Sequence, residues 1–465
     1  MSAAQTTSPP SGAGRRSSVG PNEIGGEVDT KGAVPRRVWS GTALLVGGRI
    51  FGSACTFAAL WLLAGWLTPD AFGRYTFYLA VFALLDSLAD LGTGQIAVQR
   101  TSNDPLAVLP VLAATRRIRL RAGLLGVALV GGGALAFDEP DAAWILLASL
   151  YPVTHVLELS ATVYKNKISW RVPVAMRAFA SALSLTFVLT LYAADVTRPA
   201  LYLCAVAAGS TIANVGLHLA ARRHLPPVLA SERPPARGIF KAALPLGLAG
   251  LCAQAYFYVD NLFVRAIEGP AAVGVYNLGV RILGFSIMVA LFASTAALPW
   301  FAREHAAGRL GSAIARLAQP LFTLAGLGAG VLFPWSAELL SLFGSEFAVG
   351  AASLRWLLVA VCVIYLGAAL MTGVVATGKT GAVLAITASG LGLNLVGNTL
   401  LVPRLGIEGA AIATLATESL VVVGACAVLA RIGNLPVGGW RTLLWLGGPL
   451  GFLAGSWLSS LLPLG

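Results

Sequence analysis

Long apolar runs separated by short polar segments fill the chain from about residue 40 to its end. A bilayer core about 30 Å thick is crossed by about 20 helical residues, and each of these runs is long enough to span it. The runs are continuous, whereas the strands of a membrane barrel alternate apolar and polar positions, so the runs predict helices. Thirteen segments are expected, at about residues 40–66, 72–98, 118–137, 142–164, 170–194, 199–221, 240–267, 272–299, 312–334, 352–377, 381–403, 407–430 and 442–463.

An internal repeat divides these segments into two halves. The stretch 68–75 aligns with 269–276, and Pro, Ala, Gly and Tyr match in register. Each stretch lies between the first and second helices of a group of six, so both halves enter the membrane from the same side and are parallel repeats. The expected fold class is an all-α polytopic membrane protein with two parallel six-helix bundles and one additional C-terminal helix.

Composition shifts along the chain suggest where these parts begin and end. The first residues are rich in Ser, Gly, Pro and charge and contain no apolar run, which is typical of a disordered tail. A second polar stretch lies between the two halves. We expect a disordered cytoplasmic tail at 1–38, a six-helix bundle at 39–222, a cytoplasmic linker at 223–238, a second six-helix bundle at 239–431, and the additional helix within 432–465.

The overall composition agrees with a membrane protein and excludes several classes. Hydrophobic residues make up 57% of the chain and charged residues only 11%, whereas soluble domains carry roughly 25% charged residues. A soluble enzyme and a nucleic-acid binder are therefore excluded. The five cysteines lie on five different apolar segments, so neither a disulfide framework nor a metal site is expected.

The net charge of +12 comes mainly from alternate loops. Most of the 32 Lys and Arg residues fall in the tail and in the loops that lie on the same side of the membrane as the tail. Because cytoplasmic loops carry the excess of Lys and Arg, the N-terminus is expected to be cytoplasmic. Anionic lipid headgroups are the expected partners of this face.

Charged residues inside the apolar segments are the candidates for function. A charge at the centre of a membrane helix costs at least about 2.5–3.5 kcal/mol, and the residues that remain there usually face protein or a water-filled cavity. The acids are Asp86 and Asp90 in the second segment, Glu158 in the fourth, Asp260 in the seventh and Glu418 in the twelfth. The bases are Arg49 in the first segment, Arg177 in the fifth and Arg281 in the eighth.

Two interpretations of the acids stay open. Asp86 and Asp90 are four residues apart and share one helix face, so they can share a proton for coupling or gating. Alternatively each pairs with an Arg of a neighbouring helix, and Arg49 is the expected partner of Asp90. Asp260 and Arg281 lie at similar depth in adjacent helices, so they form either a structural salt bridge or a pair in a cavity.

The bases suggest an anionic ligand. Arg49 and Arg177 lie toward the cytoplasmic side of the first half, and the planar guanidinium group binds two phosphate oxygens at once. His155 and Glu158 are three residues apart, but the chain has only four histidines and no second pair of this kind. We therefore expect no metal and no cofactor, and no enzyme motif is present.

Several stretches together resemble a known family. They are Phe72-Gly73-Arg74-Tyr75 followed by Asp90-Leu91-Gly92 and Val98-Gln99-Arg100, then Leu244-Pro245-Leu246-Gly247 with Asp260, Val273-Gly274-Val275-Tyr276, Arg281 and Ala297-Leu298-Pro299, and finally Gly406 through Thr414 with Glu418. In order and spacing they are similar to the polysaccharide biosynthesis flippases. This family is the oligosaccharide branch of the multidrug/oligosaccharidyl-lipid/polysaccharide exporter superfamily.

The resemblance implies a MATE-like fold around a central cavity and alternating access in a bacterial plasma membrane. It implies a flippase, not an enzyme, that moves undecaprenyl-diphosphate-linked oligosaccharide units to the outer leaflet. Membrane lipids, H⁺ or Na⁺ as coupling ion, and polysaccharide assembly proteins are the implied partners, with no nucleic acid. We expect substrate binding at Arg49, Arg177, Arg281 and Asp260, and ion coupling or gating at Asp86, Asp90, Glu158 and Glu418.

Other functions within this class remain open. A lipid II-type flippase and an ion-coupled drug or cation exporter of the same superfamily would share the fold. A cation exporter should have an acid-dominated cavity, whereas three of the charges inside helices here are Arg. A membrane-embedded polysaccharide polymerase or ligase is less favoured, because it should carry a long outer loop with Arg and His clusters.

Overall fold

The computed structural model describes residues 36–102, 108–166, 169–224, 236–436 and 444–461. Across these ranges the chain is helical, with no strand, which confirms the expected all-α fold class. The predicted tail at 1–38 lies almost wholly outside the described residues, as does most of the predicted linker at 223–238. Those two assignments and the bundle boundaries remain predictions.

The helices of the first half cover the first six predicted segments. α2 begins where the Thr68 hydroxyl accepts a hydrogen bond from the backbone N–H of Ala71, and proline at the first helical position favours the same start. The helices are α1 (Arg36–Trp66), α2 (Pro69–Asp90), α3 (Thr93–Ser102), α4 (Val108–Ala136), α5 (Ala142–Ala148), α6 (Tyr151–His155), the 3₁₀ helix η2 (Val156–Ala161), α7 (Thr162–Asn166), α8 (Arg171–Ala193) and α9 (Pro199–Arg222).

The second half contains the remaining predicted segments. Its helices are α10 (Ala236–Tyr258), α11 (Asp260–Ile267), α12 (Pro270–Ser286), α13 (Met288–Ala306), α14 (Leu310–Leu332), α15 (Ser336–Ser341), η3 (Ser345–Gly350), α16 (Ala351–Ala376), α17 (Thr380–Arg431) and α18 (Leu444–Ser460). α17 is interrupted at Gly406, where φ is 55°, so it contains two of the predicted segments. Ten helical stretches of the described chain are long and apolar enough to cross a membrane. The protein is a multi-pass membrane protein.

Two features of the helices differ from expectation. The predicted start of the third segment near residue 118 is wrong, because α4 begins at Val108 and contains the Arg-rich stretch 116–121. Several segments expected to be single helices are broken. The second segment breaks between α2 and α3, where Leu91 (φ 39°) and Gly92 (φ 70°) both have left-handed backbone conformations.

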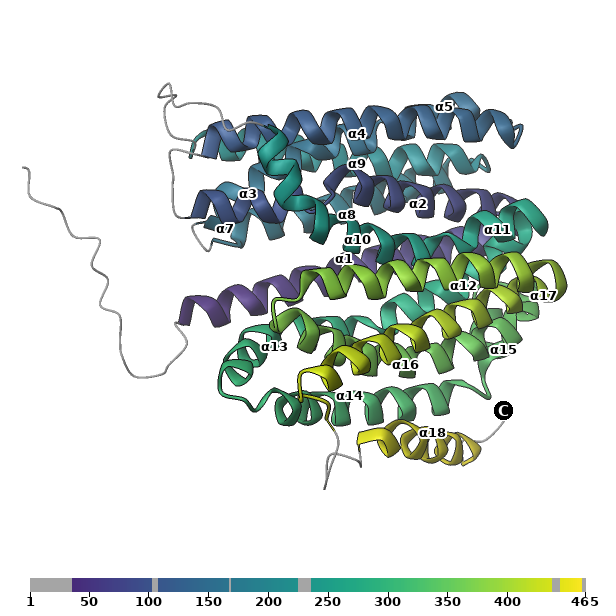
Figure 1. The fold of residues 1–465 in the computed structure, drawn as a ribbon. Coiled ribbons are helices and arrows are strands. Elements are labelled where there is room, and N and C mark those ends of the chain that lie inside the picture. The colour runs from purple at the N-terminus through teal and green to yellow at the C-terminus, as the bar shows by residue number, and fades with distance from the viewer. Residues whose placement is uncertain (1–35, 103–107, 167–168, 225–235, 437–443, 462–465) are drawn as a thin grey trace, which may run out of the picture.

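The two halves form two groups of helices that lie side by side (Figure 1). α2, α4, α5, α8 and α9 form one group, and α12 to α18 form the other. α1, α10 and α11 contact both groups. α10 packs against α2, α3 and α4 as well as against α17. α1 packs against α8, and its Trp61 indole N–H donates to the Leu342 carbonyl of the second half at 3.0 Å.

The two repeated stretches meet each other directly. Pro69 to Thr76 of α2 lie against Pro270 to Asn277 of α12, and the Asn277 amide donates to the Thr76 hydroxyl at 3.1 Å across an interval of 201 residues. An added Cβ at Gly73 would lie 1.7 Å from the Pro270 carbonyl oxygen. One at Gly274 would lie 2.7 Å from the equivalent oxygen of Pro69. This reciprocal contact is what parallel repeats about a twofold axis produce, and we call this end of the molecule the closed end.

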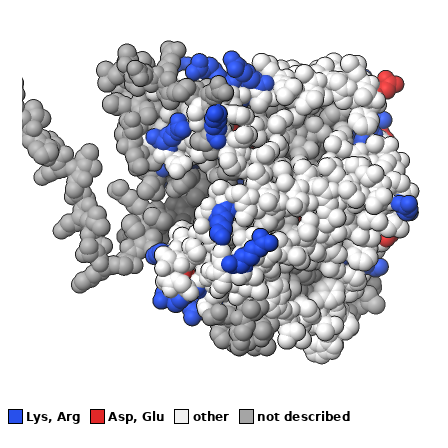
Figure 2. All heavy atoms as spheres, viewed as in Figure 1, with Lys and Arg blue, Asp and Glu red and all other residues white. Residues whose placement is uncertain are grey.

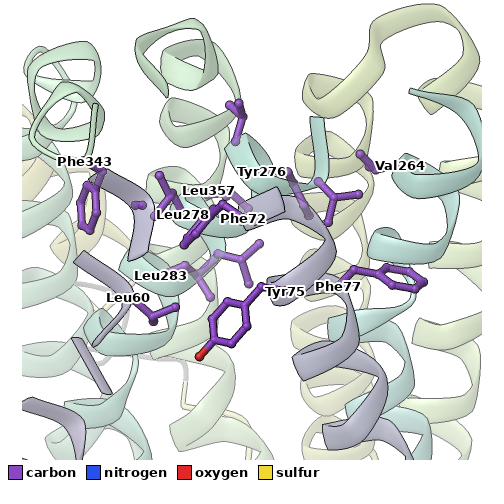
Figure 3. Packing of buried hydrophobic residues seen from close by; sticks show 14 of the residues in the cluster. Leu60, Phe72, Tyr75, Phe77, Val264, Tyr276, Leu278, Leu283, Phe343 and Leu357 are labelled. Carbon is purple, nitrogen blue, oxygen red and sulfur yellow. The ribbon is translucent and has the colours of Figure 1, made fainter. Parts of the chain in front are cut away.

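The apolar core joins the two halves mainly at the closed end. Its largest cluster joins the two halves at the closed end, where Phe72 of α2 lies among Leu278, Leu357 and Phe343 of the second half (Figure 3). Toward the opposite end the core divides into smaller clusters: one is confined to residues 249–429, two lie in the first half, and one joins Ile239 of α10 to α3 and α4. Lys and Arg side chains gather mainly at this opposite end (Figure 2), which we call the basic end. The cytoplasmic location of the basic end remains a prediction.

Candidate functional site

A polar cavity of about 300 Å³ lies within the first half, beside α10. Charged and amide side chains supply most of its polar lining, and one of them, Gln254, comes from α10 of the second half. We call this space the charged cavity. Its lining includes Asp86, Ser87, Asp90, Gln95, Arg119, His155, Glu158, Lys165 and Gln254.

Four charged side chains along this cavity form a continuous chain. The Arg177 guanidinium of α8 donates to Glu158 Oε1 at 2.6 Å, and His155 Nε2 lies 2.7 Å from Glu158 Oε2. His155 Nδ1 contacts the carboxylate of Asp86 in α2. Both ring nitrogens of His155 therefore face carboxylates, an arrangement that a doubly protonated imidazole satisfies by donating at both. The ring also stacks on Tyr151, with centroids 5.1 Å apart.

Asp90 has a different partner from the one expected. Its carboxylate pairs with the guanidinium of Arg119 in α4, not with Arg49, and it accepts the backbone N–H of Gly94 at 3.1 Å at the start of α3. Arg119 also donates to the Thr93 hydroxyl. Asp86 thus faces His155 and Asp90 faces Arg119, so each acid has its own basic partner.

Arg49 and Arg177, both expected toward the same side of the first half, lie near each other. They are close enough for electrostatic repulsion, and Arg49 lies 6.0 Å from the ring centroid of Phe292 in α13. The Arg177 side chain is 61% exposed. Two guanidinium groups that are close together and accessible can both reach one diphosphate group. Whether they bind substrate remains a prediction.

A second polar cluster is buried in the second half around Asp260. Asp260 is 1% exposed at the first position of α11. Its carboxylate accepts hydrogen bonds of 2.7 Å from the Tyr276 hydroxyl, the Thr414 hydroxyl and the Asn398 amide. The Asn398 amide also lies 3.1 Å from the side-chain oxygen of Asn394. We call these five residues the Asp260 cluster.

The expected pair between Asp260 and Arg281 does not form. The partners of Asp260 are neutral donors, and within the described ranges no Lys or Arg forms an ion pair with it. Arg281 instead interacts electrostatically with Tyr75 of α2. Glu418 is 7% exposed one helical turn beyond Thr414, and its carboxyl group contacts the Tyr256 hydroxyl.

Most of the residues that sequence reasoning missed are neutral or belong to the Arg-rich stretch 116–121, which was counted with a polar loop. Arg119 was hidden because its stretch resembled a polar loop, and His155 was considered only as a metal ligand. Asn394 and Asn398 are four residues apart in an apolar segment, a spacing that places both amides on one helix face. That pair was the available signal for the Asp260 cluster.

A third charge cluster joins the two halves at the closed end. Arg265 of α11 pairs with Glu139, which precedes α5, and their side chains are 7% and 2% exposed. The Arg265 guanidinium lies 5.9 and 5.4 Å from the ring centroids of Phe77 and Phe137. Arg74 also contacts Glu139, at 3.2 Å. This buried pair connects the bundles next to the contact between α2 and α12.

Two sequence families match parts of the chain. The family described as "Polysaccharide biosynthesis protein" matches residues 140–305, and the MatE family matches residues 245–400. These matches confirm the resemblance drawn from the sequence motifs. Comparison with curated protein sequences gives no match.

Solved structures share the fold at low sequence identity. An inward-facing multidrug resistance MATE family transporter of the MOP superfamily is 14% identical with a TM-score of 0.65, covering 85% of this chain and 98% of its own. The lipid II flippase MurJ in an inward closed conformation is 12% identical with a TM-score of 0.64, covering 90% and 98%. A MOP superfamily transporter from Pyrococcus furiosus is 15% identical with a TM-score of 0.64, covering 86% and 96%. The chain therefore has the MATE-like fold.

Proposed function

We propose that this protein is a flippase that moves undecaprenyl-diphosphate-linked oligosaccharide units from the inner to the outer leaflet by alternating access. The observation that carries the proposal is the charged cavity, with the accessible guanidinium groups of Arg177 and Arg49 close together beside it. The matches to the polysaccharide biosynthesis family and the similarity to the MurJ fold support the same substrate class.

Glu158 sets how strongly the cavity holds an anion. Its carboxylate accepts one hydrogen bond from the Arg177 guanidinium. A diphosphate group binds Arg177 by replacing Glu158, which then keeps its contact with His155. Because two like-charged acceptors compete for one guanidinium group, the substrate is held only moderately and can leave on the other side.

We infer that the Asp260 cluster is the site of the coupling ion. A buried carboxylate without a basic partner is costly unless it is protonated or holds a cation. Its surroundings offer the hydroxyl oxygen of Thr414 and the side-chain oxygen of Asn394, which suit a proton carrier or a small cation such as Na⁺. Asp260 lies at the junction of α10 and α11, so its charge acts directly on two of the helices that contact both halves.

The first expected result concerns the two guanidinium groups. Arg49→Ala and Arg177→Ala should each lower transport about tenfold, because each removes a charge-assisted contact to the diphosphate. The Lys variants should recover only part of this loss, since a point charge lacks the bidentate geometry. Arg431→Ala, which removes an exposed Arg outside the lining of the cavity, serves as the matched control.

The measurement uses proteoliposomes that contain a fluorescent undecaprenyl-diphosphate oligosaccharide, with outer-leaflet label quenched over time. Parallel vesicles containing lipid II and vesicles containing a cationic dye test the two alternative substrates. Full activity of both alanine variants would contradict diphosphate binding at this site. Transport of the cationic dye alone would favour a drug exporter.

The second expected result concerns coupling. Asp260→Asn keeps the size of the side chain and a carbonyl oxygen for Tyr276 and Thr414, so the protein should still fold. Transport should then no longer respond to a pH or Na⁺ gradient, because the variant cannot bind or release a cation. Glu338→Gln, which changes an exposed acid, is the control. A gradient response equal to that of the unaltered protein would place the ion site elsewhere.

A further inference from the structure

The charged cavity has two chemically different sides. The side assigned to the diphosphate is cationic, because Arg177 reaches it from α8 and Arg49 lies close by. The other side is formed by the end of α2, the start of α3 and α10, which packs against both of them (Figure 1). We call this side the polar wall. Its carboxylate, hydroxyl and amide groups come from Asp86, Ser87, Asp90, Gln95 and Gln254.

The packing of α10 places Gln254 in the polar wall. An added Cβ at Gly247 would lie 2.0 Å from the Leu91 carbonyl oxygen, so α10 crosses the break between α2 and α3 in direct contact. Gln254 is seven residues beyond Gly247, which is about two helical turns, so the two residues share one face of the helix. That face is turned toward the first half, and Gln254 accordingly lines the cavity together with Asp86.

The polar wall keeps hydrogen-bonding capacity for a ligand. In the described part of the chain, the ion pairs and hydrogen bonds of Asp86 and Asp90 use only Oδ1 of each carboxylate, and the two side chains are 34% and 40% exposed. Gln95 and Gln254 are also exposed, and among the described residues neither amide makes a hydrogen bond. Each amide offers two donors and an acceptor oxygen. The wall therefore presents donors and acceptors together.

The charges of the cavity indicate the kind of ligand. A second phosphate at the polar wall would be repelled by Asp86 and Asp90, whose free oxygens can only accept. A cation would gain little, because each of these acids already faces a basic side chain. A neutral group rich in hydroxyls fits both conditions. Hydroxyl groups donate to carboxylates, and they both donate to and accept from amides.

We propose that the polar wall binds the sugar next to the diphosphate, and that Gln95 and Gln254 recognise its hydroxyl groups. The inference rests on the proposed function, because it assigns the part of the substrate that the arginines do not hold. A volume of about 300 Å³ is small for a ligand site, so the wall holds this first sugar and not the whole oligosaccharide. Since Gln254 belongs to α10 and Asp86 to α2, the bound sugar contacts both halves.

The test compares the binding of two lipids to the purified full-length protein in neutral detergent. One is the undecaprenyl-diphosphate oligosaccharide of the transport assay, and the other is undecaprenyl diphosphate, which carries no sugar. The unaltered protein should bind the first lipid at least about tenfold more tightly than the second. Gln254→Ala should lower the affinity for the first lipid about tenfold and change the affinity for the second less than about twofold. Arg177→Ala should weaken both lipids by a similar factor, because both contain the diphosphate.

Two further variants control for folding and for the type of substitution. Gln95→Ala tests the second amide and should give the same selective loss as Gln254→Ala. Both amides are exposed, so neither replacement leaves a buried group unpaired, and the unfolding temperature should not change. Gln319→Ala makes the same substitution in α14, outside the lining of the cavity, and should change neither affinity.

Three outcomes would overturn the proposal. Equal affinity of the unaltered protein for the two lipids would mean that the sugar is not bound, while the diphosphate site would stand. Equal losses for the two lipids in Gln254→Ala would mean that Gln254 acts on the diphosphate and not on the sugar. Failure of the unaltered protein to bind either lipid would overturn the proposed function and the sugar site with it.

Discussion

Gly73→Ala is expected to abolish transport while both helical bundles remain folded. A methyl group at this position would lie 1.7 Å from the Pro270 carbonyl oxygen and 3.0 Å from the Gly274 backbone nitrogen. Both neighbours are backbone atoms of α12, so no side chain can rotate away to make room. The methyl group can be accommodated only if α2 and α12 separate, and this separation removes the closed end.

The variant is checked by transport and by accessibility. Thr76 is fully buried at this contact, so a cysteine there, in a background without other cysteines, should react with an impermeant maleimide only when the closed end opens. We expect faster labelling of the Gly73→Ala protein than of its parent, in which the closed end opens only transiently during transport. Gly132→Ala in α4 is the control, since nothing lies within 4 Å of its added Cβ. A Gly73→Ala protein that transports at the normal rate would show that this contact is not part of the cycle.

The contact at Gly73 also illustrates what could be predicted from the sequence. The repeat was visible because Pro, Ala, Gly and Tyr recur at a fixed interval, and from it follow the two parallel halves. That the two copies touch each other was not visible, because a match in sequence gives the register of two stretches but not their separation. Glycine was a residue shared by the repeats, and only the structure gives the physical reason for it.

The helices were predictable because apolar length is a strong signal, whereas their breaks were not. Leu91 ends α2 in a left-handed conformation that a leucine rarely adopts, and nothing in its side chain predicts this. The structure supplies the reason: an added Cβ at Gly247 of α10 would lie 2.0 Å from the Leu91 carbonyl oxygen, so α10 crosses directly over the break. Such tertiary contacts between distant segments are not encoded in local patterns.

The candidate site was predictable by residue type but not by partner. Depth along a helix can be estimated from sequence, which is why Arg49 and Arg177 were both expected toward the same side of the first half. The direction in which a side chain points cannot be estimated in this way. For this reason the partners were predicted wrongly: Asp90 pairs with Arg119 and not with Arg49. Asp260 contacts neutral donors and not Arg281. Searching only for charges also left the two asparagines of the Asp260 cluster unrecognised.

Glu139→Gln should destabilise the closed end far more than the loss of a carboxylate from an exposed ion pair does. Arg265 would then keep its charge between Phe77 and Phe137 without a carboxylate partner, and its side chain is only 7% exposed. A stranded buried charge typically costs about 3–5 kcal/mol. Arg74 would lose less, because it retains Asp70 at 2.9 Å.

The matched variant removes both charges. Glu139→Gln/Arg265→Gln leaves no stranded ion. The double variant should therefore unfold at a higher temperature than Glu139→Gln, close to the unfolding temperature of the unaltered protein. Glu304→Gln, which breaks the exposed pair with Arg309, should change the unfolding temperature little, since solvent screens that pair. Additive losses at Glu139 and Arg265 would mean that the two residues act independently. The pair joins the two bundles, so a variant in which only Glu139 is replaced should also open the closed end more readily. A cysteine at Thr76 should therefore be labelled faster in Glu139→Gln than in the double variant.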